Sequence, residues 1–114
     1  MSGNDMALLR EAQERGALLR VLAQDYARVR TPFSSLAGAL DLLGFPMTVE
    51  TLQWALIYLA DRGYIRVWRA SDERTYRSDR VGTQIADMVV FAKLLPEGKL
   101  LLDGRRAEDP GVRF

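Results

Sequence analysis

Gly63 divides the chain into two stretches whose hydrophobic patterns have different periods. Across residues 5–63, apolar side chains recur every three to four positions among strong helix formers, which predicts helices with one buried face. Residues 64–95 carry β-branched and aromatic side chains around a polar, arginine-rich insert, as two strands joined by a long loop would. The chain has 114 residues, of which 48% are hydrophobic, enough for one domain with its own core. We therefore expect a single α+β domain that is mainly helical.

Three helices are expected in the first stretch. The first begins at Asn4 or Asp5, since either suits an N-cap, and ends before Thr31-Pro32 because the residue before a proline disfavours helical angles. Gly16, in the middle of this helix, indicates either a kink or a close crossing with another element. The face expected to be buried consists of Leu8, Leu9, Ala12, Leu19, Leu22 and Tyr26.

The second helix is expected over residues 36–43 with Ser34 or Ser35 as its cap, and the third begins after Thr48, with Thr51 three positions on. The inward face of the third helix is predicted to hold Leu52, Ala55, Leu56 and Leu59. That phase turns the other side chains outward, namely Glu50, Thr51, Gln53, Trp54, Ile57, Tyr58 and Asp61.

Two strands are expected after the third helix. They cover residues 64–68 and 88–94, where β-branched and aromatic residues gather. Thr75-Tyr76, in the polar insert between them, is a candidate for a short extra strand.

A short helix is expected to close the domain. Pro96 suits the first turn of a helix over residues 97–102, and Gly104 suits its end. We therefore divide the chain into a domain over residues 1–104 and a loosely held C-terminal tail over residues 105–114.

The composition argues against most enzyme chemistry. The chain contains no histidine and no cysteine, so the usual ligand sets for zinc, iron–sulfur clusters and haem are missing, together with imidazole and thiol mechanisms. The sequence shows no glycine-rich phosphate loop and no nucleophile elbow. Asp72 and Glu73 are adjacent acids that an acid–base mechanism could use, but they lie in a turn-like segment, where solvent exposure is the simpler explanation. We expect a protein that is not an enzyme and has no cofactor and no metal.

The sequence also indicates where the protein works. Its longest stretches without charge, residues 31–40 and 51–60, are about half of the ~20 residues that span a bilayer. The N-terminus lacks the basic and apolar regions of a signal peptide, and the absence of cysteine fits a reducing compartment. We expect a cytoplasmic protein with no membrane association.

Two segments carry a resemblance to a known family. Residues 48–65 read TVETLQWALIYLADRGYI, whose hydrophobic positions and LxxxGYI exit resemble the winged-helix pattern of bacterial transcription regulators. Residues 94–104 read LLPEGKLLLDG and resemble the L-T-P-E-G-x-x-L-L-x-G motif that follows the wing in many of them, with Leu95 in place of the usual threonine cap. The resemblance implies a winged helix-turn-helix: three helices, a β-hairpin wing and a short C-terminal helix.

A narrower resemblance covers about residues 6–112. The size, the early start of the first helix and the closing DPGV, residues 109–112, resemble small proteins of Mu-like bacteriophages and prophages. In winged-helix proteins the third helix is presented to the DNA major groove, and the wing touches an adjacent groove or the phosphates. The resemblance thus implies a phage or prophage protein that binds double-stranded DNA and regulates transcription.

Charge is distributed unevenly over this expected DNA-binding region. Residues 48–61 hold two acids and no base, whereas residues 62–80 hold six arginines against three acids, a net +3. Because phosphate contacts need Lys, Arg or backbone donors, we expect the wing to lead DNA binding. The candidate wing contacts are Arg66, Arg69, Arg74, Arg77 and Arg80. On the third helix, Gln53 is a candidate reader of adenine and Glu50 of cytosine.

Each assignment has a rival. The hairpin arginines also fit a solvated strand pair balanced by its own acids, or a protein interface. Gln53 and Glu50 also fit an exposed helix surface. Trp54 with Ile57 and Tyr58 fits a protein contact, because exposed apolar patches usually mark interfaces. Trp54 by itself also fits core or wing packing, or a DNA contact.

Three functions follow from these alternatives. The first is DNA binding led by the wing, by a homodimer that associates through its first helix and so presents two wings. The second is a winged-helix protein-interaction module, acting in phage assembly or on a host factor, that uses the third helix. The third is a structural component of the virion.

Overall fold

The structure is a computed structural model that describes residues 3–27, 29–72 and 87–114. Its helices are α1 (Gly3–Gln24), α2 (Phe33–Leu42), α3 (Val49–Asp61) and α4 (Pro96–Leu102). Its strands are β1 (Thr31–Pro32), β2 (Ile65–Arg69) and β3 (Val89–Leu94), and a 3-10 turn, η1 (Ala70–Asp72), follows β2. The α+β, mainly helical class is confirmed.

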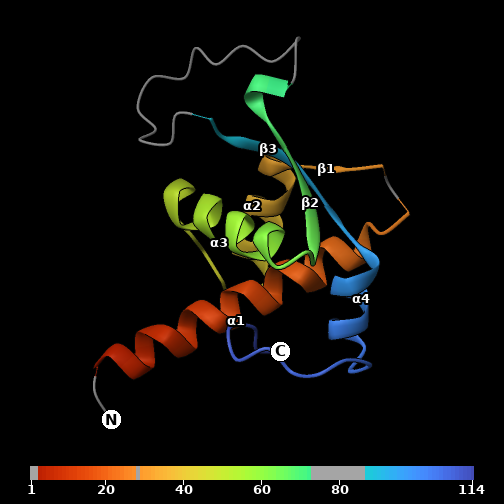
Figure 1. Cartoon of the computed structure of the whole chain (residues 1–114). Coiled ribbons are helices and arrows are strands. Elements are labelled where there is room, and N and C mark those ends of the chain that lie inside the picture. The colour runs from red at the N-terminus through yellow and green to blue at the C-terminus, as the bar shows by residue number, and fades with distance from the viewer. Residues whose placement is uncertain (1–2, 28, 73–86) are drawn as a thin grey trace.

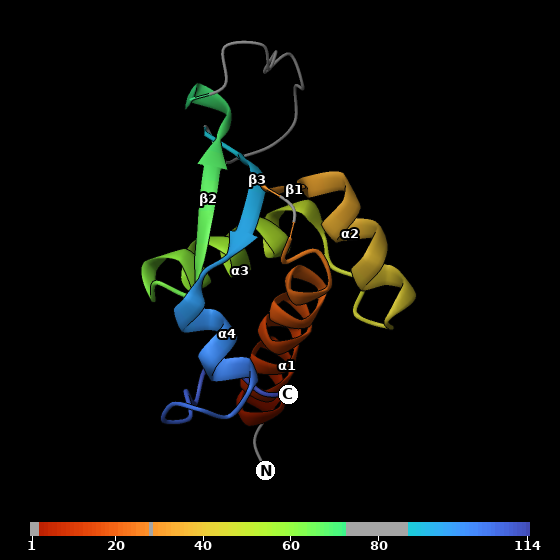
Figure 2. The ribbon, with the colours of Figure 1, turned by 90° about the vertical axis from the view of Figure 1, so that its right-hand side faces the viewer.

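The strands form one antiparallel sheet in the order β1-β3-β2, so β3 is the central strand. The long helix α1 runs beneath α2 and α3, with α4 below its C-terminal half, and its N-terminal turns project past the other helices and the strands (Figure 1). Seen from the side, β2 and β3 lie in front of α3, and no labelled helix covers the side of these strands that faces the viewer (Figure 2). The sheet therefore has one face packed on helices and one face left open.

The register of the sheet separates these two faces. Ile65 lies opposite Leu94 and Val67 opposite Ala92, and these side chains point toward the helices. The core between this inner face and α1, α2 and α3 contains Leu18, Leu19, Leu22, Leu36, Leu40, Leu52, Leu56, Leu59, Ile65, Val89 and Leu94, all of them under 2% exposed. Burial of these side chains is the main source of stability in a domain of this size.

The start of α3 and its buried face follow the sequence prediction. Thr48 Oγ1 accepts a hydrogen bond of 3.1 Å from the backbone N–H of Thr51, which satisfies one of the free donors at the helix start. The four side chains predicted to face inward, Leu52, Ala55, Leu56 and Leu59, are all buried.

The start of α2 differs from the prediction. The helix begins at Phe33, so Ser34 and Ser35 lie in its first turn, and the N-cap position is Pro32, which makes no side-chain cap hydrogen bond. Thr31 and Pro32 form β1, opposite Ala92 and Phe91 of β3. The sequence prediction used Thr31-Pro32 only to mark the end of the first helix, so it missed this short strand.

The first turns of α1 are more exposed than predicted. Ala12, Leu19 and Leu22 are buried as expected, but Leu8 is 63% exposed and Leu9 38%. The N-terminal turns extend past the rest of the molecule (Figure 1), so no other element covers them. Near the other end of the predicted face, Tyr26 is 39% exposed.

The C-terminal residues pack on the domain, contrary to the expected loose attachment. Val112 is buried in the core, and the backbone N–H of Arg113 donates a hydrogen bond of 2.9 Å to the carbonyl of Ala12 in α1. A Cβ atom at Gly16 would overlap the carbonyl of Arg113. Of the two interpretations of Gly16, the close crossing is therefore the one that the structure contains.

A buried carboxylate fixes the same segment. The hydroxyl of Tyr64 donates to Asp109 Oδ2 at 2.6 Å, and the backbone N–H of Gly111 donates to Oδ1 at 2.8 Å. Arg62 lies 3.6 Å from Oδ2. Burial by itself raises the pKa of Asp109, but the two hydrogen bonds and the nearby guanidinium outweigh it, so the pKa lies below the usual value.

Candidate nucleic-acid interface

Gln53 is not available to read a base. Its side chain is fully buried, and its amide donates to the carbonyl of Val89 at 2.8 Å and accepts from the N–H of Val89 at 2.7 Å. The amide thus meets both backbone polar groups of Val89, as a neighbouring strand would. Gln53 was predicted to face outward, and that prediction was wrong. The backbone groups that pair with its amide belong to Val89, 36 positions later in the chain, so the sequence around Gln53 does not reveal them.

The exposed side of α3 is acidic and partly apolar. Glu50, Thr51, Trp54 and Asp61 are exposed as predicted, and Trp54 retains 55% of its accessible surface. Both charged residues among them are acids. This side of α3 therefore repels phosphates, and it holds one large aromatic side chain, Trp54, that is more than half exposed.

Ile57 and Tyr58 do not join Trp54 in one exposed patch. Ile57 is partly buried against the core. The ring of Tyr58 has the guanidinium of Arg15 at 3.8 Å from its centroid and that of Arg62 at 4.8 Å. The outward prediction for these two was wrong: Ile57 packs against the core, and Tyr58 is covered by Arg15 of α1 and by the C-terminal segment at Gly111.

Arg69 helps to close the base of the β2–β3 hairpin. Its side chain is half-buried and donates to the carbonyl of Asp87 at 2.9 Å. The Asp87 carboxylate accepts from the backbone N–H and the hydroxyl of Ser71, at 3.0 and 2.7 Å, and these hydrogen bonds lower the pKa of Asp87. Arg69 is thus partly occupied within the protein.

Of the other four candidate arginines, only Arg66 lies within the described residues. Arg66 is exposed on β2. Arg74, Arg77 and Arg80 lie outside the described residues, as does the short strand predicted at Thr75-Tyr76.

The open face of the sheet brings cations and aromatic rings together. Arg66 lies opposite Lys93, and Trp68 lies opposite Phe91, so all four side chains share this face. The guanidinium of Arg66 is 4.6 Å from the centroid of Trp68, and that of Arg30 is 3.7 Å from the centroid of Phe91. We name this surface the outer sheet face; it consists of Arg30, Pro32, Arg66, Trp68, Phe91 and Lys93.

Sequence reasoning missed Arg30, Trp68, Phe91 and Lys93 as parts of a site. The signal was present in the alternation of residues 65–69 and 91–94, because side chains two positions apart on a strand share a face. Arg30 carried no such signal, since it precedes a strand that the sequence did not reveal.

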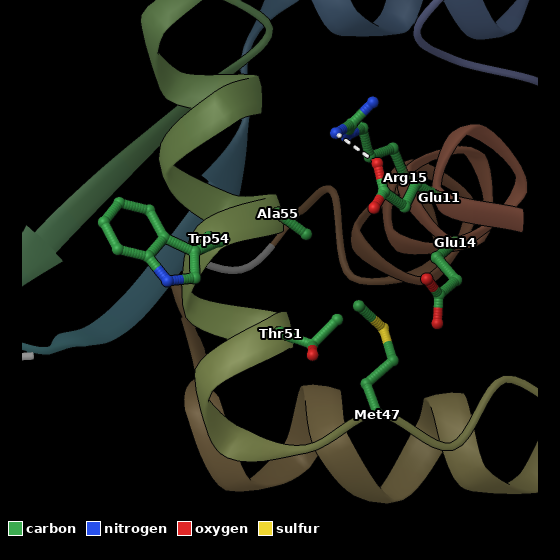
Figure 3. Close-up of a pocket in the computed structure, with 7 residues that line it drawn as sticks. All are labelled: Glu11, Glu14, Arg15, Met47, Thr51, Trp54 and Ala55. Carbon is green, nitrogen blue, oxygen red and sulfur yellow. Dashed lines mark ion pairs between the residues drawn. The ribbon is translucent and has the colours of Figure 1, made fainter. Parts of the chain in front are cut away.

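A pocket of about 350 Å³ lies between α1 and α3. Thr51, Ala55 and Met47 face Glu11, Glu14 and Arg15 across it, while the indole of Trp54 points away (Figure 3). Burial raises the pKa of Glu14, whose side chain is only 10% exposed. Arg15 lies 3.7 Å from Glu11. With two glutamates on its wall, this pocket does not suit an anionic ligand.

Comparisons with known proteins give no family. No protein-family model matches the sequence, and no curated protein is a significant match. Within residues 3–27, 29–72 and 87–114, no cluster of three or more potential metal-ligating side chains is present. None of the described helices combines the length and the hydropathy needed to cross a membrane.

Proposed function

We propose that this chain is a winged-helix protein, of the kind encoded by Mu-like phages and prophages, that binds DNA without catalysis. The order α1-β1-α2-α3-β2-β3 and the three-stranded antiparallel sheet support this fold, in which the β2–β3 hairpin is the wing. The single observation that carries the DNA-binding proposal is the gathering of Arg30, Arg66 and Lys93 on the open face of the sheet.

The proposal assigns the DNA contact to the sheet and wing and not to α3. Phosphates supply most of the affinity in nonspecific DNA binding and require cationic or N–H donors. Arg66 and Lys93 stand opposite each other on the outer sheet face, and the sequence between β2 and β3 also contains Arg74, Arg77 and Arg80. The exposed side of α3 carries carboxylates, which repel phosphates, so the proposal does not use Glu50 to read a base.

Replacement of Arg66 by alanine is expected to weaken binding to a duplex and to make it less sensitive to salt. A gel shift repeated over a series of salt concentrations should show the slope of log K against log salt decrease by about one. Arg105→Ala is the matched control, because it removes one exposed arginine from the region after α4. An equal effect of Arg105→Ala, or binding without salt dependence, would contradict this mechanism.

A protein-interaction function of α3 remains the second candidate. Trp54 is 55% exposed, on a side of α3 whose charged residues, Glu50 and Asp61, are acidic. Exposed aromatic residues are enriched at the centres of protein interfaces. A phage or host protein with a basic, apolar surface is the partner that this side of α3 would suit.

Homodimerisation through α1 is part of the proposal. Met6 is 55% exposed and Leu8 63%, on the turns of α1 that extend past the rest of the molecule (Figure 1). Two such helix ends bury apolar surface if they associate. A dimer presents two outer sheet faces to one DNA molecule and raises the apparent affinity.

Leu8→Glu is expected to convert the dimer to a monomer, because it places a charge within the contact. Sedimentation equilibrium should show the wild type at twice the chain mass and Leu8→Glu at the chain mass. Gln13→Glu, which adds the same charge at another exposed position of α1, should leave the dimer intact. If Trp54→Ala dissociates it instead, the contact belongs to α3; a wild type that is monomeric throughout would refute dimerisation.

A further inference from the structure

We infer that the outer sheet face binds a single strand of nucleic acid, with unpaired bases stacked on its planar groups. This inference rests on the proposed function, because it names the form of DNA that the same site accepts. It assigns a stacking role to Trp68 and Phe91 and a phosphate-binding role to Arg66 and Lys93.

Guanidinium groups lie over both aromatic rings of this face, so rings and guanidinium planes together form its stacking surface. The guanidinium of Arg30 lies 3.7 Å from the centroid of Phe91 and 5.6 Å from that of Trp68. The guanidinium of Arg66 also lies over the ring of Trp68, 4.6 Å from its centroid. Aromatic rings and guanidinium planes are both surfaces on which bases stack in complexes with single strands.

The cations are placed to reach the phosphates of such a strand. Arg66 is two residues from Trp68 on β2, and Lys93 is two residues from Phe91 on β3. Two residues of a strand span about 6.6 Å, but the charged groups are not held at that spacing. The guanidinium of Arg66 reaches back to 4.6 Å from the centroid of Trp68, and Nζ of Lys93 donates a hydrogen bond of 3.1 Å to the carbonyl of Tyr26. Both cations therefore border the ring pair. A base on the rings can thus place its phosphate beside a cation.

A duplex would use only half of this surface. In paired DNA each base is stacked between its neighbours, so its flat face is not available to a protein ring, whereas the bases of a single strand are. The phosphates of a duplex can contact Arg66 and Lys93, but Trp68 and Phe91 would then contact no base. The combination of half-buried rings with cations therefore favours an unpaired strand, bound with little sequence preference.

Fluorescence anisotropy with a labelled oligothymidylate of about 20 nucleotides, and with a duplex of equal length, tests the inference. The single strand should bind more tightly than the duplex. Phe91→Leu keeps an apolar side chain but removes the ring, and it should weaken single-strand binding about 5- to 150-fold while changing duplex binding little. Trp54→Leu, which removes an exposed ring from α3, is the matched control and should change neither. Circular dichroism checks that both variants fold.

The possible results separate the inference from the proposed function. Tighter binding of the duplex, or wild-type affinity of Phe91→Leu for the single strand, would overturn the inference and leave duplex binding as the function. If Trp68 and Phe91 only pack against each other and against the arginines, Phe91→Leu should bind the single strand with wild-type affinity. Failure to bind either nucleic acid would overturn both. A preference for the single strand that Phe91→Leu abolishes and Phe91→Tyr retains supports the stacking role.

Discussion

Gln53→Leu is expected to lower the free energy of unfolding by about 2 to 6 kcal/mol. Leucine has a similar size but provides no hydrogen bond, so the N–H and the carbonyl of Val89, which the amide contacts at 2.7 and 2.8 Å, would both be buried without a partner. Each such group costs about 1–3 kcal/mol. Urea unfolding followed by circular dichroism measures the loss.

Trp54→Leu, at the next position of α3, is the control for this experiment. Its side chain is 55% exposed, so we expect a change of no more than about 0.5 kcal/mol. If Gln53→Leu folds with wild-type stability and loses affinity for DNA instead, then Gln53 reads bases and the structural role assigned to it is wrong.

Asp109→Ala is expected to release the C-terminal segment from α1 and α3. The variant leaves the Tyr64 hydroxyl and the Gly111 N–H, which contact the carboxylate at 2.6 and 2.8 Å, without their acceptor. We expect the free energy of unfolding to fall by about 2 to 4 kcal/mol. Hydrogen exchange at the Arg113 amide, which bonds to Ala12 in the wild type, should become faster.

The effect of Asp109→Ala should depend on pH. The folded-state pKa of Asp109 is lowered, so the ionised carboxylate stabilises the fold above the unfolded pKa of about 3.9, and this contribution is lost as the pH falls through the folded pKa. Burial and the hydrogen bond to Asp109 raise the pKa of Tyr64. Its contribution is therefore present below about pH 10 and is lost as the pH rises through the folded pKa.

The measurement compares the wild type and Asp109→Ala at neutral pH and below about pH 4. The difference in stability should shrink in acid. Asp103→Ala removes an exposed carboxylate that pairs with Lys99 at 2.9 Å, and an exposed pair of this kind contributes about 0–1 kcal/mol. A pH-independent difference, or an equal loss in Asp103→Ala, would contradict the role of Asp109.

Local patterns predicted the elements well and long-range contacts poorly. The cap at Thr48 and the buried face of α3 depend on residues three or four positions apart, so a single stretch of sequence contains the whole signal. Gln53 depends on Val89, whereas the helical phase of the apolar residues had placed it on the outside. The fate of a polar residue is decided by whether a buried partner exists, which periodicity does not report.

The site was predictable only in part for the same reason. The excess of arginine in the hairpin was visible in the sequence, but charge counting does not say which arginines are occupied within the protein, as Arg69 is. The ring pair Trp68 and Phe91 depends on the register of two strands separated by the long insert. The tail was predicted to be loosely held because the last residues of a domain often are, although Val112 belongs to the core.

The packing of the C-terminal segment also bears on how the chain folds during synthesis. Arg15 of α1 hydrogen-bonds to the carbonyl of Gly111, a partner 96 positions later, and Val112 completes the core that α1 begins. A ribosome makes α1 first, so the side of this helix that receives the segment stays uncovered until nearly all the residues described have emerged. Contacts of this sequence separation slow folding and prolong exposure of apolar surface. A nascent chain that stalls before residue 109 would therefore present α1 to chaperones and proteases.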